Sequence, residues 1–72
     1  MDRNSVALQL LEEAFDEKPI IMDLSVKLLD LDGWDSLTAM MLIDLTKERY
    51  GLHLDIEDIG EMTVVDFSKL FI

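Results

Sequence analysis

A serine stands at the predicted start of a helix, directly after a short acidic turn. The segment reads Gly33-Trp34-Asp35-Ser36-Leu37. Because the first N–H groups of a helix lack intrahelical partners, a phosphate esterified to the Ser36 hydroxyl would be stabilised there by about 0.3–1 kcal/mol. A hydroxyl at that position is also accessible to another enzyme. Ser36 is therefore a candidate for covalent modification, although a serine at a helix start more often serves only as a cap.

The segment after Ser36 carries more apolar residues than one core-facing stripe needs. On a helical wheel, one arc of about 100° is expected to face inward, and it holds Ala39, Leu42, Ile43, Thr46 and Tyr50. A separate sector combines apolar and acidic residues, namely Leu37, Met40, Met41, Asp44 and Glu48. Flexible methionines suit the binding of several partners. This sector is either a docking face or ordinary core covered by the loop or by a short helix.

Other chemistries fit the residue spacing less well. The run Asp30-Leu31-Asp32-Gly33 has the composition of a calcium loop, but aligning Gly33 with the sixth position places Ala39 at the twelfth, where an acid is required. These acids are therefore interpreted as solvent-facing turn residues. His53 is the single histidine and there is no cysteine, so no metal site is predicted. A hydrolase pair of Ser36 and His53 is disfavoured because no Gly-x-Ser-x-Gly segment is present.

The charge balance restricts the class of partner. Sixteen acidic and six basic residues give the 72-residue chain a net charge of −10, while half of its residues are hydrophobic. Such a chain folds, repels nucleic acid and anionic lipid, and favours basic protein partners. The absence of cysteine and of an export or membrane-inserting segment favours the cytoplasm. We expect one monomeric, freestanding domain spanning residues 1–72, with no membrane insertion.

Two features precede the Ser36 segment. An amphipathic pattern predicts a helix from Asn4, acting as N-cap, to Asp16, with Pro19 preventing its continuation. The stretch from Lys18 to Trp34 lacks a sustained helical period and is predicted to be a long loop. Its alternating apolar residues are expected to attach the loop to the core rather than to form a strand, and they are Leu24, Val26 and Leu28.

Three further helices are predicted after the loop. One begins at residue 35 or 36 and runs to about Tyr50, where Gly51 supplies the left-handed position that ends helices. A short helix follows Asp55 and ends near 60–62. The last starts at Thr63, with Asp66 at capping-box spacing, and runs to about residue 71. The predicted fold class is all-α, a four-helix bundle of three longer helices and one short helix.

Several short segments occur at the spacing of one known family. Asp35-Ser36-Leu37 follows Gly33-Trp34, and the later segments are Leu42-Ile43, Tyr50-Gly51, Ile56-Glu57-Asp58-Ile59 and Thr63-Val64-Val65-Asp66-Phe67. With these segments the chain resembles the acyl carrier protein family over nearly its whole length. The resemblance implies a carrier whose Ser36 receives 4'-phosphopantetheine from coenzyme A, through a magnesium-dependent phosphopantetheinyl transferase. The thiol of that arm would hold acyl groups as thioesters, and the chain itself would not be an enzyme.

The resemblance also implies partners and further site residues. Asp35 would help to place metal and phosphate during modification. The expected partners are the transferase, an acyl-loading ligase or acyltransferase, and a ketosynthase or other acyl-processing enzyme. They would dock on Leu37, Met40, Met41, Asp44 and Glu48, with Ile59 and Met62 bordering the arm.

One departure from the family bears on the pathway. Thr38 and Met41 stand where members that serve fatty acid synthesis carry acids. The difference favours a specialised polyketide, lipid, peptide or polysaccharide pathway. An aminoacyl or peptidyl carrier and an unmodified helical interaction domain remain the alternatives.

Overall fold

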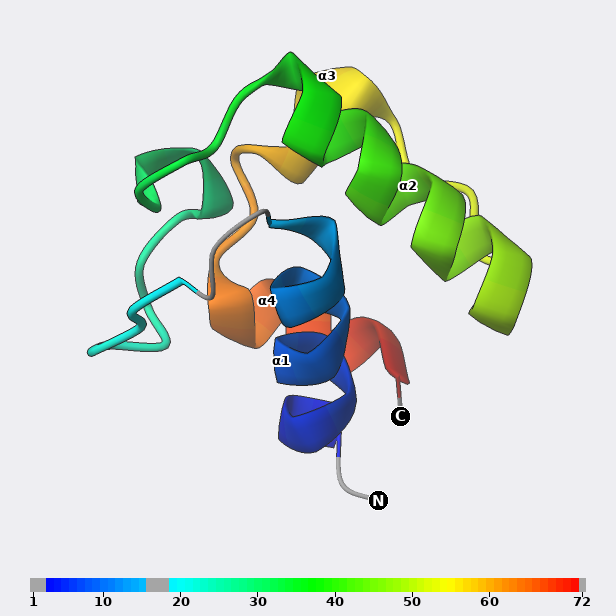
Figure 1. Ribbon diagram of the computed structural model, residues 1–72. Helices are drawn as coiled ribbons and strands as arrows, with labels where there is room; N and C mark the ends of the chain where they lie inside the picture. Colours follow the sequence, from blue (N-terminus) through cyan, green and yellow to red (C-terminus); the bar gives the residue numbers. More distant parts are fainter. Residues whose placement is uncertain (1–2, 16–18, 72) are drawn as a thin grey trace.

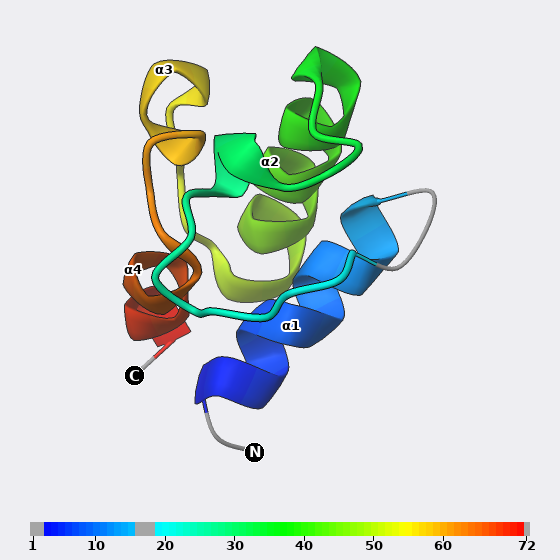
Figure 2. The same cartoon turned by 90° about the vertical axis from the view of Figure 1, so that its left-hand side faces the viewer.

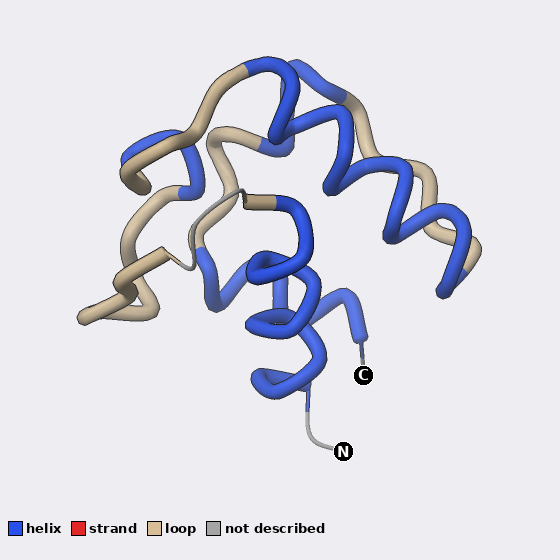
Figure 3. Tube along the Cα trace, viewed as in Figure 1, coloured by secondary structure: helices blue, strands red, loops and turns tan. Residues whose placement is uncertain are grey.

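The computed structural model describes residues 3–15 and 19–71, and the regular elements in these residues are all helical (Figures 1 and 3). The α-helices are α1 (Arg3–Ala14), α2 (Ser36–Tyr50), α3 (Ile56–Ile59) and α4 (Val64–Ser68), and the 3-10 turns are η1 (Leu28–Asp30) and η2 (Lys69–Phe71). No strand occurs in these two ranges. The prediction of an all-α fold with a long connection between the first two helices is confirmed.

Helix α1 forms because its apolar residues recur every three or four positions. Ala7, Leu10, Leu11 and Ala14 are all at most 2% exposed, which makes one continuous buried stripe. The predicted N-cap was wrong, because α1 begins at Arg3 and Asn4 therefore has helical geometry inside the first turn. The helix also ends at Ala14, well before Pro19 could stop it. The predicted end at Asp16 lies outside the described residues.

The connection between α1 and α2 is fastened to the C-terminal third of the chain by backbone hydrogen bonds. The N–H groups of Val64 and Val65 donate to the carbonyls of Val26 and Leu24, both at 3.0 Å. The Leu28 N–H donates to the Met62 carbonyl at 2.9 Å, and the Leu28 side chain is fully buried. An isolated bridge between Lys27 and Thr63 takes the place of a strand pair. The predicted role of these alternating residues as anchors is confirmed.

Helix α2 has a clear signal at each end. The Asp35 carboxylate accepts the Thr38 N–H at 2.8 Å, and Gly51 ends the helix with a left-handed φ of 69°. The buried stripe contains Thr38, Ala39, Leu42 and Thr46. The inward position predicted for Tyr50 was wrong, because this ring lies at the edge of the stripe and is 45% exposed while packing edge-on against Phe71.

The last two helices are shorter than predicted. Helix α4 has five residues and tightens into η2, so the described chain has two long helices and not three. Local capping and burial hold these short pieces. Thr63 and Asp66 form the predicted capping box, and Ile59, Val64 and Phe67 are at most 2% exposed.

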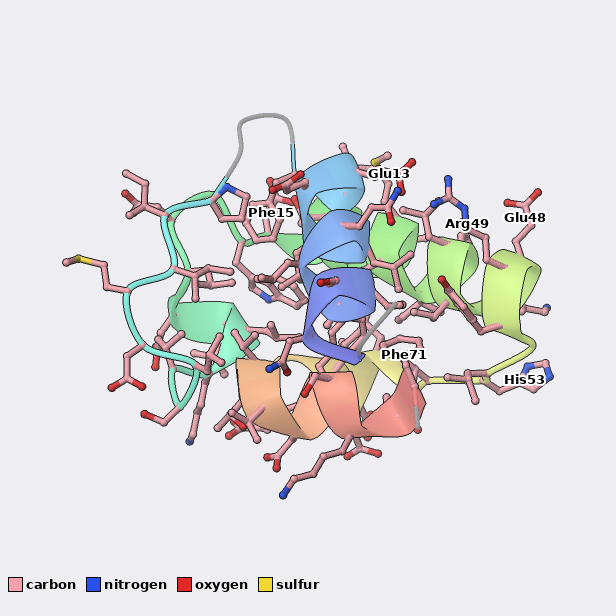
Figure 4. The ribbon with its side chains drawn as sticks, turned by 90° about the horizontal axis from the view of Figure 1, so that it is seen from below. Glu13, Phe15, Glu48, Arg49, His53 and Phe71 are labelled. Atoms are coloured by element: carbon pink, nitrogen blue, oxygen red, sulfur yellow. The ribbon has the colours of Figure 1, made fainter. Side chains whose placement is uncertain are left out.

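The core lies where α1 crosses the other helices. Figure 2 shows α3 and the C-terminal end of α1 on opposite sides of α2, and Figure 1 shows α4 beside α1. Arg49 of α2 forms two hydrogen bonds with Glu13 of α1, one of 2.7 Å, and the pair lies at the surface in Figure 4. Hydrogen bonding to Arg49 lowers the pKa of Glu13. Among the described residues, no helix has the length and apolar character needed to cross a bilayer.

Candidate functional site

Ser36 is the first residue of α2, and its side chain is exposed. The residue before it is fixed by capping: the backbone N–H of Thr38 donates to the Asp35 carboxylate and lowers the pKa of Asp35. The Thr38 hydroxyl donates in turn to the Gly33 carbonyl at 3.3 Å. These two hydrogen bonds attach the turn to the first turn of α2, directly beside the exposed Ser36.

Packing of an aromatic side chain also holds the turn before Ser36. The rings of Trp34 and Phe15 lie 6.1 Å apart between centroids, which joins this turn to the end of α1. Trp34 also approaches Gly60, where an added Cβ would lie 3.6 Å from the indole nitrogen and 3.3 Å from the Cβ of Leu29. Trp34 therefore packs the loop against the bundle. A left-handed φ of 89° at Gly33 lets the chain turn from η1 into α2.

The second apolar sector of α2 is not covered by the described part of the chain. Leu37 is 65% exposed, Met40 54% and Met41 40%, and both Asp44 and Glu48 are exposed. Figure 4 shows Glu48 pointing away from the helical core. The alternative in which the loop or α3 buries this sector is therefore excluded for these side chains. We call Leu37, Met40, Met41, Asp44 and Glu48 the outer face of α2.

The two residues predicted to border a prosthetic arm lie in the core or against it. Ile59 is fully buried in the core cluster, and its position beside an arm stays a prediction. Met62 is half-buried and packs against the core cluster. The exposed apolar residue of α3 is Ile56, at 49%. Ile56 lines a groove of about 580 Å³ together with Met40 of α2 and residues 53–55.

Sequence reasoning missed a second and larger hollow on the opposite flank of α2. It has a volume of about 810 Å³ and lies between the end of α1, the connecting loop and the first two turns of α2. Two loop residues on its wall are almost fully exposed, Ile20 at 85% and Met22 at 93%. The only signal in the sequence was the presence of apolar residues in a stretch without helical period.

The described residues contain no group of three or more His, Cys, Asp or Glu side chains that could hold a metal ion. His53 is exposed after the C-terminal end of α2, and Figure 4 shows it pointing outward. The chemistry available at the α2 N-terminus is thus that of one exposed hydroxyl beside an ionised carboxylate. Comparison of the chain with protein-family models, with curated proteins and with solved structures gave no match.

Proposed function

We propose that the protein is an acyl carrier protein that bears 4'-phosphopantetheine on Ser36. The observation that carries the proposal is the exposed Ser36 hydroxyl at the first position of a 15-residue helix, beside an apolar face with acidic neighbours. The Asp35-Ser36-Leu37 segment and its distance from Thr63-Val64-Val65-Asp66-Phe67 support the same family. An acyl-carrier type of helical bundle and a cytoplasmic location form part of this proposal.

The modification would be a phosphoryl transfer to Ser36. The Ser36 oxygen attacks the phosphorus that bears pantetheine in coenzyme A, the bond from that phosphorus to the bridging oxygen breaks, and adenosine 3',5'-bisphosphate leaves. The serine proton passes to the transferase. The arm, once attached, supplies a thiol that holds acyl groups as thioesters.

The residues around Ser36 fit a phosphodiester. The first N–H groups of α2 point toward this end of the helix, and the helix dipole favours an anion there by about 0.3–1 kcal/mol. Asp35 opposes this effect with its own negative charge. During transfer Asp35 would help to hold a divalent cation, which would offset that repulsion by supplying positive charge next to the modified serine.

The outer face of α2 would bind the loading and processing enzymes. Its acids steer basic enzyme surfaces and raise the association rate, while the exposed Leu37, Met40 and Met41 supply a small apolar contact. Such a contact is specific and brief, as a carrier needs in order to visit several enzymes. Because a tethered acyl group has a high effective concentration, weak docking suffices.

The direct test is incubation of the purified chain with coenzyme A, magnesium and a broad-specificity phosphopantetheinyl transferase. Intact-mass spectrometry should show the addition of one phosphopantetheine. Ser36→Ala should abolish the addition, whereas the control Ser25→Ala should retain it, since Ser25 is an exposed serine of the loop that donates to Asp23. No gain of mass on the unaltered chain rules the carrier proposal out.

The outer face of α2 also supports a second candidate, an unmodified helical domain that binds one protein partner. Exposed methionines serve that role without any prosthetic group. The same mass measurement separates the two functions. An aminoacyl or peptidyl carrier would also gain the mass of one phosphopantetheine. The mass of the cargo on protein isolated from its own host distinguishes that carrier from an acyl carrier.

A further inference from the structure

The large hollow beside α2 has buried apolar residues at its base and acidic residues in its lining. Phe15 and Leu31 form its floor and are at most 7% exposed. Leu37 and Met41 from α2 and Met22 from the loop contribute to its walls. We call this hollow the loop cleft. It continues the apolar part of the outer face of α2, at Leu37 and Met41, onto the connecting loop.

Two loop residues at the cleft have no role in holding the fold. Ile20 and Met22 are 85% and 93% exposed, and neither belongs to the core or to the side chains packed against it. By contrast, Val26 and Leu31 of the same connection pack into the bundle. Solvent-exposed apolar side chains that gather around a concave surface are typical of a binding site.

The described residues at the rim of the cleft carry one sign of charge. Within residues 3–15 and 19–71, the charged residues that line the cleft are Asp23, Asp30, Asp32 and Asp35, with no Lys or Arg among them. Lys27, on the same loop, is directed to Glu61 at 3.0 Å instead. Hydrogen bonds from Ser25 lower the pKa of Asp23, and those from Thr38 lower the pKa of Asp35, so both acids stay ionised near neutral pH.

We infer that the loop cleft receives a basic segment of a partner protein, which inserts one large apolar side chain and places Lys or Arg against the acidic rim. The volume of about 810 Å³ accommodates a few side chains. Charge complementarity decides among occupants: a second copy of this chain would bring another net charge of −10, and an anionic membrane would be repelled. This binding does not depend on the modification of Ser36.

The test uses the full chain with Ser36→Ala, so that no arm competes, and a synthetic helical peptide of Lys and Leu with one Phe as the probe. Methyl NMR titration at low salt locates the contact. Shifts should concentrate on Ile20, Met22, Leu37 and Met41. Shifts confined to Met40 and Ile56, in the groove on the α3 side, would overturn the inference, as would the absence of binding.

Paired variants separate the cleft from general attraction to an acidic protein. Ile20→Ser combined with Met22→Ser should weaken peptide binding about tenfold, because two apolar anchors are lost. The matched control is Ile56→Ser, which removes an exposed apolar side chain from the other flank and should change affinity less than about twofold. Equal losses in both would contradict the proposed location.

A second pair of variants tests the acidic rim. Neutralising Asp30 and Asp32 to Asn should weaken binding severalfold and reduce its salt dependence, whereas neutralising Glu57→Gln and Asp58→Asn on α3 should have little effect. Similar effects in the two pairs would show attraction to net charge alone. Sedimentation provides the last check: a dimer of the free chain that Ile20→Ser and Met22→Ser dissociate would assign the cleft to a second copy instead.

Discussion

Both faces of α2 carry apolar side chains, but those of the inner face are buried and those of the outer face are exposed. On the inner face, which is the buried stripe of Thr38, Ala39, Leu42 and Thr46, Leu42 is fully buried in the core cluster, whereas Leu37 on the outer face is 65% exposed. Both are leucines of one helix, so local preference does not separate them. The inner face stabilises the fold because it removes apolar area from water, and the outer face contributes little to that stability. Exposed apolar area that the fold does not need is the physical basis for assigning binding to the outer side.

The inner face should give the largest effect on stability. Leu42→Ala leaves a cavity in a filled core and should lower the free energy of unfolding by about 2–5 kcal/mol, measured by urea denaturation followed by circular dichroism. If that variant does not fold, Leu42→Met keeps most of the volume and should cost less than about 1.5 kcal/mol. A small loss for Leu42→Ala, comparable with that of an exposed site, would break the comparison between the two faces.

The C-terminal end of α2 should give an intermediate effect. Gly51 has a φ of 69°, and an added Cβ would meet no atom within 4 Å. Gly51→Ala should therefore cost about 1 kcal/mol from backbone strain alone, since no clash contributes. Urea denaturation measures the change. An unaltered midpoint would mean that the left-handed cap is not needed to end the helix.

The N-terminal end of α2 should show a pH dependence. The pKa of Asp35 is lowered in the folded chain, chiefly by the hydrogen bond from the Thr38 backbone N–H. The stabilisation from Asp35 is therefore fully present above its unfolded pKa, near about 3.9, and is lost as the pH falls through the lower folded value.

Asp35→Ala tests this directly. The variant should be less stable than the parent at neutral pH, and the difference should shrink as the pH falls below about 4. Thermal unfolding at a series of pH values measures it. Asp35→Asn, which keeps a capping oxygen without the charge, should restore much of the neutral-pH stability. A difference that is constant with pH would contradict the ionised cap.

The outer face should give the smallest change in stability. Leu37→Ser should alter the free energy of unfolding by less than about 0.5 kcal/mol, because the side chain is largely in water in the folded state as well. Its effect should appear in partner binding, measured by the rate of modification of Ser36 at limiting concentrations of chain. Destabilisation comparable with that of Leu42→Ala would show that the outer face belongs to the core.

The positions of the helix ends around Ser36 followed from the sequence because their causes are local. Asp35, Gly51 and the pair Thr63 and Asp66 act on N–H groups or φ angles within a few residues, and each occurs where predicted. The ends of α1 were less well predicted. Asn4 has the chemistry of a cap, yet α1 starts one residue before it. A capping side chain marks a possible start, and packing of Ala7, Leu10 and Leu11 decides how far the helix extends.

The sequence by itself determined an all-helical chain, an acidic surface and a serine at the first position of a helix. Only the tertiary structure decided which apolar residues remain at the surface. Ile56 and Ile59 are both isoleucines of one short helix, but only Ile59 is buried. The loop cleft likewise depends on where the connecting loop is held, through hydrogen bonds from Val64 to Val26 and from Val65 to Leu24, which are far apart in the sequence. Such long-range contacts leave no periodic pattern in a sequence, because the burial of a residue depends on which distant segment packs against it.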